Sequence, residues 1–125
     1  MTSRVRTVTF DTHDPYELAG FWVQVLRASR NPDDHPDDPG AEVITDGMTL
    51  LFERNDDDKV VKNRVHLCLE PDTTRDAEVE WLQTLGATIA NDLRNPDGTG
   101  WVVMHDPEGN EFCVLRSAGE RAATS

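Results

Sequence analysis

An internal repeat constrains the fold of this chain more than any other feature of its sequence. The stretch FWVQVLRA (21–28) aligns with EWLQTLGA (80–87), 59 residues later. Carried upstream, the same offset places TVTFD (7–11) on HLCLE (66–70). The first pair has apolar residues at helical spacing and the second pair alternates as strands do. The chain is therefore expected to contain two copies of one unit, each beginning with a strand and a helix.

A second alignment extends the repeat towards the end of each copy. DGMTLLFER (46–54) aligns with EGNEFCVLR (108–116), now 62 residues later, and loops can absorb the change in offset. Each half reads as a strand, a helix and then two or three strands. This order predicts an α+β fold with two tandem βαβββ modules, at about 4–54 and 63–116, whose helices lie on the outer face of curved mixed sheets around a cleft.

Both helices carry their own boundary signals. Asp14 to Glu17 form a capping box with proline at the first helical position. The second helix is expected to begin at Thr73, with Asp76 three residues later as a weaker acidic version of the box, and to end at Gly86. The tryptophans Trp22 and Trp81, which match in the repeat, are expected to anchor the core.

The remaining elements follow from alternation and turn residues. The strands are expected at about 4–11, 29–31, 41–46, 48–54, 63–70, 87–92, 99–104 and 110–116. With 125 residues the chain is long enough for one domain, expected to span 1–118 and to be followed by a mobile tail at 119–125.

Alternation also sorts the strand residues into a covered face and an open face. The covered face, against the helices, is expected to hold Val8, Phe10, Val65, Leu67, Leu69, Phe112 and Val114. The open face mixes polar and apolar side chains and holds Thr7, Thr9, Leu51, Glu53, His66, Cys68, Glu111, Cys113 and Leu115. Such a mixed concave face predicts a small-molecule cleft. The alternative is that this face packs against another subunit.

Charge and composition exclude several classes of function. The net charge of −12 and pI near 4.5 argue against a nucleic-acid surface and would attract a cationic small molecule. No apolar run is long enough for a membrane helix and no signal core is present, so a soluble cytoplasmic protein is expected. An acidic loop carries Asp33, Asp34, Asp37 and Asp38 and lacks EF-hand spacing; it is a solvated loop or an acidic lip for a basic ligand.

Several of these stretches resemble the vicinal-oxygen-chelate superfamily, which contains glyoxalase I, bleomycin-resistance proteins and extradiol dioxygenases. The similar pieces are DPYELAGFWVQVL, RVHLCLE, LGA and DPEGNEFCVL, which together span residues 4–116. FW in the first helix and VKNRVHL make the chain most similar to glyoxalase-like proteins common in actinobacteria. The resemblance implies paired βαβββ modules around a ligand and a homodimer.

In metal-dependent members of that superfamily, each module supplies one ligand from its first strand and one from its last. The resemblance, with the repeat, places these positions on Thr7, His66, Leu51 and Cys113. Leucine has no donor atom and threonine is a weak ligand, so this set cannot supply three good protein ligands. The expectation is therefore no metal and no other cofactor, with His66 and Cys113 as the only weak candidates for a divalent ion.

The open face supplies the candidate site residues. The ligand pocket is expected to be lined by Thr7, Thr9, Leu51, His66, Cys68, Trp101 and Cys113, with Trp101 placed to stack on a ligand. The catalytic candidates are His66, Glu53 and Glu111. Cys113 is either a nucleophile activated by His66 or a buried apolar filler, and His66 is either a general base or a histidine of the pocket wall.

Three functions remain open. The first is a metal-free protein that sequesters a small ligand, as in the bleomycin-resistance branch. The second is a lyase, isomerase or dioxygenase-type enzyme acting on a small carbonyl or phenolic compound, using His66 with Glu53 or Glu111, with or without a metal. The third is a partner domain that works only through its dimer interface.

Overall fold

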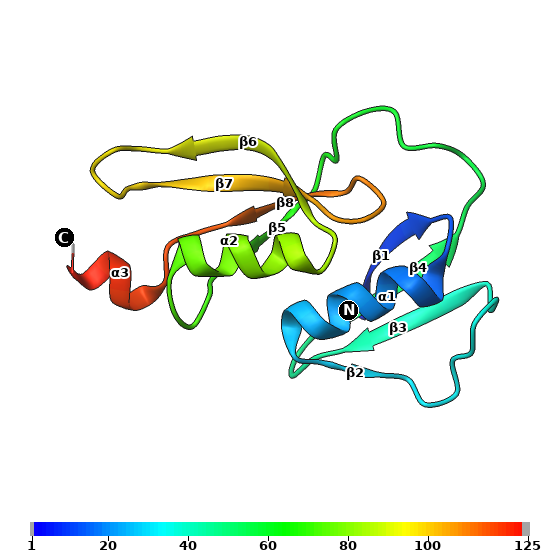
Figure 1. The fold of residues 1–125 in the computed structure, drawn as a ribbon. Helices are drawn as coiled ribbons and strands as arrows, with labels where there is room; N and C mark the ends of the chain where they lie inside the picture. The colour runs from blue at the N-terminus through cyan, green and yellow to red at the C-terminus, as the bar shows by residue number, and fades with distance from the viewer. Residues whose placement is uncertain (1, 124–125) are drawn as a thin grey trace. The chain divides into compact units, whose positions relative to one another are not determined.

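The computed structural model describes residues 2–123 and divides the chain into two compact units, 1–58 and 59–125 (Figure 1). The first unit contains β1 (Thr7–Thr12), α1 (Pro15–Leu26), β2 (Ser29–Arg30), β3 (Gly40–Ile44) and β4 (Thr49–Arg54). The second contains β5 (Leu67–Leu69), α2 (Arg75–Thr84), β6 (Thr88–Arg94), β7 (Gly100–His105), β8 (Glu111–Val114) and α3 (Ala118–Ala123). The predicted α+β class is confirmed. The single domain and the cleft between modules remain predictions.

The two units have the same sheet topology. The strand orders are β1-β4-β3-β2 and β5-β8-β7-β6, and in each sheet the first strand runs parallel to the last while the other pairs are antiparallel. Even the register repeats. Val8 lies opposite Leu50, and Leu67, its counterpart at offset 59, lies opposite Phe112, the counterpart of Leu50 at offset 62. The sequence repeat is thus a repeat of strand pairing as well as of element order.

The first helix forms as its sequence predicts. Asp14 caps it by accepting a hydrogen bond from the Glu17 N–H at 3.3 Å, Pro15 occupies the first turn, and Arg27 ends it in the left-handed conformation with φ 49°. Trp22 is buried by α1 against the first sheet, as predicted. Full burial of one such side chain contributes roughly 1.5–3 kcal/mol.

The second helix departs from its prediction at two residues. Its N-cap is Thr74 rather than Thr73, because the Thr74 hydroxyl accepts the Ala77 N–H at 3.2 Å. Gly86 follows the helix at φ 110°, as predicted. Trp81 was wrongly expected in the core; its side chain is 39% exposed, because the buried stripe of α2 runs through Val79 and Leu82.

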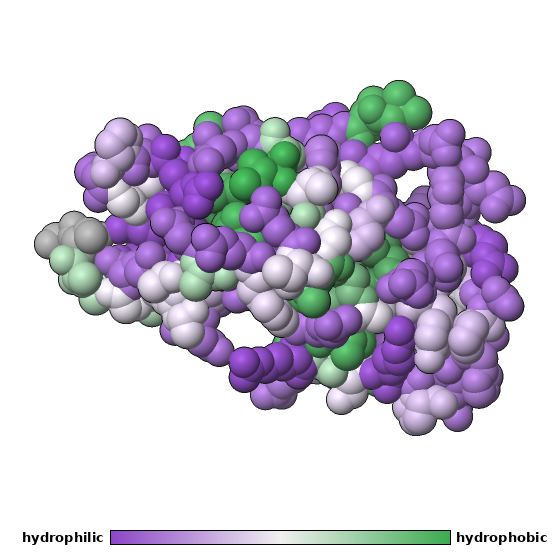
Figure 2. Space-filling view, in the orientation of Figure 1, coloured by the Kyte–Doolittle hydropathy of each residue, from purple (hydrophilic) through white to green (hydrophobic). Residues whose placement is uncertain are grey.

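The covered faces of both sheets follow the predicted alternation with one exception. The strand residues buried against the helices are Ala41, Val43, Leu50, Phe52, Val102, Met104, Phe112 and Val114. Val65 was wrongly placed among them and is 73% exposed, because β5 begins only at Leu67 and the preceding residues form a bend. The face in Figure 2 is mostly hydrophilic, in keeping with the acidic composition.

A buried arginine fastens the β6–β7 hairpin to α2. Arg75 is only 4% exposed, and its Nη1 donates to the carbonyl oxygens of Gly98, Thr99 and Gly100 at 3.0–3.2 Å. Gly100 has φ +91°, and a Cβ there would lie 2.1 Å from the Leu93 carbonyl oxygen. Only glycine therefore permits this hairpin to close beneath the guanidinium.

The end of the second unit is helical where a mobile tail was expected. Glu120 of α3 accepts hydrogen bonds from the backbone N–H groups of Arg75 and Ser117, at 2.7 and 2.9 Å. Residues 124–125 lie outside the described part, and the mobility of the tail remains a prediction. Within residues 2–123, no helix is long and apolar enough to cross a membrane.

Replacing Arg75 tests the role of this buried contact. Arg75→Met should lower the free energy of unfolding by about 2 kcal/mol, because hydrogen bonds to a charged group stabilise by about 1.5–3 kcal/mol each when they are buried. Arg121→Met is the control, since Arg121 pairs with Glu70 at the surface and should cost less than about 1 kcal/mol. Equal losses in urea denaturation would contradict a structural role for Arg75.

Candidate functional site

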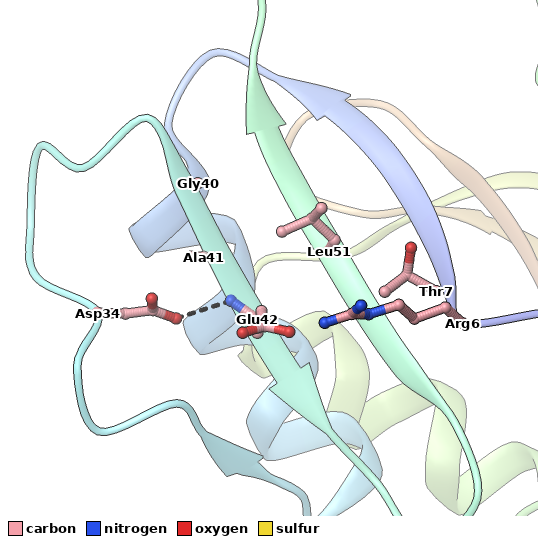
Figure 3. A pocket seen from close by; sticks show the side chains of 7 residues that line it. All are labelled: Arg6, Thr7, Asp34, Gly40, Ala41, Glu42 and Leu51. Atoms are coloured by element: carbon pink, nitrogen blue, oxygen red, sulfur yellow. Dashed lines mark hydrogen bonds between the residues drawn. The ribbon is translucent and has the colours of Figure 1, made fainter.

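The open face of the first sheet carries a hollow of about 500 Å³ (Figure 3). Its lining consists of Arg6, Thr7, Asp34, Gly40, Ala41, Glu42 and Leu51. Two predicted pocket residues, Thr7 and Leu51, are therefore part of one hollow. Thr9 lies on the same face, opposite Leu51, and its hydroxyl is 3.3 Å from that of Thr7.

Acidic and basic groups both face this hollow. Leu51 lies opposite Glu42 on β3, and the Arg6 side chain reaches across the sheet towards Glu42 (Figure 3). The Asp34 carboxylate accepts the Glu42 N–H at 2.8 Å, which ties the acidic loop to the edge of the hollow. Of the four clustered aspartates, Asp34 is the one that lines it.

Sequence reasoning did not single out Arg6 or Glu42. The signal for Glu42 was present, because Ala41 and Val43 are buried and the residue between two inward-facing strand residues must point to the open face. Arg6 precedes β1, so alternation does not assign it to a face.

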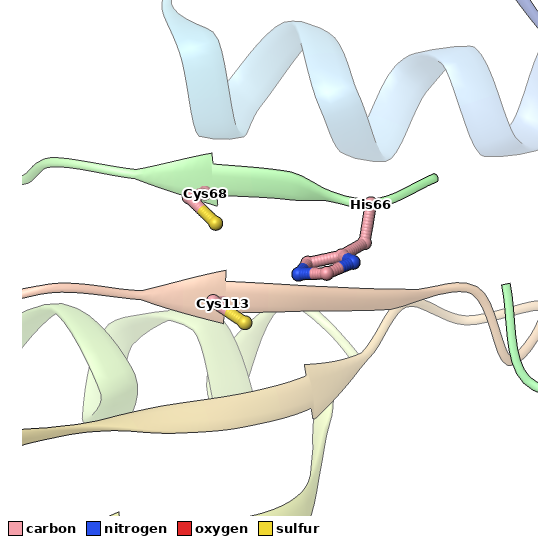
Figure 4. Close-up of side chains that lie close together, drawn as sticks. All are labelled: His66, Cys68 and Cys113. Atoms are coloured by element: carbon pink, nitrogen blue, oxygen red, sulfur yellow. The ribbon is translucent and has the colours of Figure 1, made fainter. Parts of the chain in front are cut away.

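The second unit gathers three donor side chains on the open face of its own sheet. Cys68 on β5 lies directly opposite Cys113 on β8, and His66 immediately precedes β5. One ligand atom from each residue lies within 4.8 Å of the other two. Figure 4 shows the imidazole and both sulfur atoms on the same side of the two strands. The structure thus brings together the three predicted pocket residues His66, Cys68 and Cys113.

The two thiols differ in environment. Cys68 is exposed, whereas Cys113 is 5% exposed. Burial, followed by the neighbouring Cys68, raises the pKa of Cys113 to about 11. A thiol with that pKa is protonated near neutral pH, so this environment does not activate Cys113 as a nucleophile.

Glu111 is committed to an ion pair. Burial alone would raise its pKa, but the Lys59 ammonium, 2.6 Å from Oε1, and the Asn63 N–H outweigh that effect and lower the pKa below its ordinary value of 4.5. The side chain is 6% exposed, and Oε2 is buried without a hydrogen-bond partner. A paired, ionised carboxylate is unsuited to donate a proton near neutral pH.

The last two predicted site residues are at the surface. Glu53, near the end of β4, is exposed. Trp101 on β7 is 43% exposed and shares the face of Cys113, because Val103, two residues later, lies opposite Cys113. Trp101 thus lies on the open face of the second sheet, where it could stack on a planar ligand.

Two four-stranded mixed sheets of identical topology, each with an open mixed face, define the βαβββ class of ligand-binding proteins. Residues 7–115 match the family model described as a glyoxalase-like domain. The chain therefore belongs to the glyoxalase-like family, within the vicinal-oxygen-chelate superfamily. The closer similarity to actinobacterial proteins remains an expectation.

Solved structures of the same fold support this assignment. A glyoxalase/bleomycin resistance protein/dioxygenase family enzyme from Burkholderia phytofirmans is 18% identical, with a TM-score of 0.72 over 90% of this chain and 97% of that chain. The fosfomycin resistance protein FosX from Mesorhizobium loti is 15% identical, with a TM-score of 0.68 over 98% and 99%. No curated protein matches the sequence.

A metal-bound structure permits a direct test of the ligand set. A FosX variant from Listeria monocytogenes, solved with manganese(II) and a dihydroxypropylphosphonic acid, is 14% identical, with a TM-score of 0.69 over 98% of this chain and 99% of that chain. Manganese prefers oxygen ligands. At the superfamily's ligand positions this chain has Leu51, which has no donor atom, and Cys113, a buried thiol. These residues do not fit a hard, oxygen-preferring ion.

The difference between the thiols can be measured by alkylation. In reduced, metal-stripped protein at pH 7.5, iodoacetamide should modify Cys113 at least about tenfold more slowly than Cys68, because Cys113 is buried and protonated. Peptide mass spectrometry gives the two rates, and denatured protein is the control in which both thiols are accessible. Faster modification of Cys113 would instead identify it as an activated nucleophile.

The Glu111–Lys59 pair predicts a specific dependence of stability on pH. Since the folded pKa of Glu111 is lowered, its contribution is present above the unfolded value of 4.5 and is lost as pH falls through the folded value. Glu111→Gln should therefore destabilise most near neutral pH, and its difference from wild type should shrink below about pH 4.5. Glu80→Gln, on the exposed side of α2, controls for net charge. A difference that stays constant down to about pH 3 would contradict this account.

Proposed function

We propose that this protein binds and sequesters a small cationic ligand, which it holds with its own side chains and without a hard divalent ion. The observation that carries the proposal is the hollow of about 500 Å³ on the first sheet, with two carboxylates at its wall. Ligand pockets of about 300–1,000 Å³ accommodate drug-sized molecules. The net charge of −12 adds a long-range attraction for cations.

The residues of the hollow suggest how the ligand is oriented. Asp34 and Glu42 face a positively charged group, Leu51 and Ala41 supply apolar contact, and Arg6 would take an anionic or polar end. The Asp34 hydrogen bond to the Glu42 backbone holds the two acidic residues in one arrangement before any ligand arrives. A preordered pair loses less conformational entropy on binding than two mobile side chains would.

The enzymatic alternative has weaker support. It needs His66 with a carboxylate, and Glu111 is paired with Lys59 while Glu53 is exposed. FosX proteins and the oxidase ChaP-H2 show that relatives of this fold include resistance proteins and oxidases. At 15% and 17% identity they support a shared fold, not a shared reaction. Dimerisation and a cytoplasmic location remain predictions.

Ligand screening tests this proposal. Thermal-shift screening of cationic antibiotics and small aromatic amines should yield a compound that stabilises the protein, since a ligand at 100 times its Kd adds about 2.7 kcal/mol. Asp34→Asn and Glu42→Gln should each weaken that compound, measured by calorimetry, by about tenfold, because each removes one facing charge.

Asp33→Asn is the matched control, because it removes the same charge from the same loop at an exposed position outside the hollow. Binding that is weakened equally by all three variants would show only a general charge effect. Binding that is unaffected by Asp34→Asn and Glu42→Gln would place the ligand elsewhere and contradict the proposal.

A further inference from the structure

We propose that His66, Cys68 and Cys113 form a site for a thiophilic metal ion, most simply Zn²⁺, contained within the second unit. The donor atoms lie within 4.8 Å of one another on one face of the sheet. Two sulfurs and an imidazole suit Zn²⁺ and Cu⁺, whereas an oxygen-rich set suits manganese. This site is independent of the ligand hollow in the first unit.

The spacing is close to what tetrahedral ligation requires. Zinc–sulfur bonds of about 2.3 Å put two sulfur ligands about 3.8 Å apart, so the widest separation has to close by about 1 Å. His66 and Cys68 are both exposed, and rotation of their side chains can supply this movement without disturbing the core. Cys113 is fixed by burial and serves as the rigid member of the set.

Strand pairing explains why the two sulfurs meet. Cys68 and Cys113 are directly opposite on neighbouring parallel strands, so both side chains leave the sheet on the same side. His66 lies two residues before Cys68, and alternation returns its side chain to that face (Figure 4). In the first unit the residues in the matching positions are Thr7, Thr9 and Leu51, which offer no such set.

The exposure of the cluster is also suited to metal binding. Two of its three members face solvent, which gives an ion an entry path. Three protein ligands leave a fourth tetrahedral position for water or a small anion, as in zinc sites with an open position. Cys113 must lose its proton when the ion binds, and the positive charge of the ion stabilises the thiolate that forms.

Cobalt(II) is the probe, because its spectrum reports both geometry and sulfur ligation. It is titrated into full-length protein that has been stripped of metal and kept reduced with a phosphine. We expect one equivalent to give intense visible bands of tetrahedral cobalt with a sulfur-to-cobalt charge-transfer band, and Zn²⁺ to remove both. Calorimetry in buffers of different ionisation enthalpy should show at least about one proton released, from Cys113.

Variants of the two exposed ligands test the assignment without altering the core. Cys68→Ser should reduce the charge-transfer band, and both Cys68→Ser and His66→Asn should weaken cobalt binding at least about tenfold, since loss of even an outer-shell partner costs about 10–100-fold. His35→Asn is the control, an exposed loop histidine of the first unit.

The opposite results overturn the proposal. These are the absence of a charge-transfer band, or binding that is equal in wild type, Cys68→Ser and His66→Asn. Because the cluster and the hollow share no residue, Cys68→Ser should leave ligand binding in the first unit unchanged. Failure of this proposal is thereby distinguished from failure of the proposed function.

Discussion

The parallel pairing of the first strand with the last strand is the constraint on which each unit depends. Parallel neighbours cannot be joined by a tight turn, so the chain must leave the sheet, form a helix over one face and return. That crossover covers one face of each sheet and leaves the other open. It also brings residues more than 40 positions apart into direct opposition, Thr9 to Leu51 and Cys68 to Cys113. The positions available for chemistry are therefore set by the backbone before any side chain is chosen.

The same backbone positions carry different chemistry in the two units. In the first, threonine and leucine leave a hollow whose charged groups come from neighbouring segments, the acidic loop and β3. In the second, the corresponding positions hold two thiols. A nearby carboxylate, Glu111, is neutralised by Lys59 at 2.6 Å and does not belong to the donor cluster. Duplication thus supplied two equivalent sheets, and substitution made one suited to an organic ligand and the other to a soft cation.

Much of this could be predicted from the sequence, because it depends on local patterns. The repeat, the capping signals and the alternation located the helices, the strand order and the residues of the open faces. The pairing of Cys68 with Cys113 could not be predicted, since register between distant strands depends on how the intervening helix packs. Val65 and Trp81 were misplaced because alternation and helical spacing continue in the sequence beyond the points where the strand begins and the buried stripe ends.

Contacts between distant segments were also beyond sequence reasoning. Lys59 and Glu111 are 52 positions apart, and Arg75 reaches carbonyl groups 23 to 25 positions later. Nothing local in the sequence distinguishes these charged residues from others at the surface, and only the folded arrangement buries them. They in turn decide which carboxylates remain available to a ligand or a reaction.

The central claim, that the two units divide an organic-ligand site from a soft-metal site, is tested most directly by a crystal structure of the zinc-loaded protein with anomalous diffraction data at the zinc edge. The account predicts an anomalous peak bonded to Cys68 Sγ, Cys113 Sγ and a ring nitrogen of His66, and no zinc peak beside Thr7 and Leu51. A zinc ion held by oxygen ligands alone, or a peak in the hollow of the first unit, would contradict it.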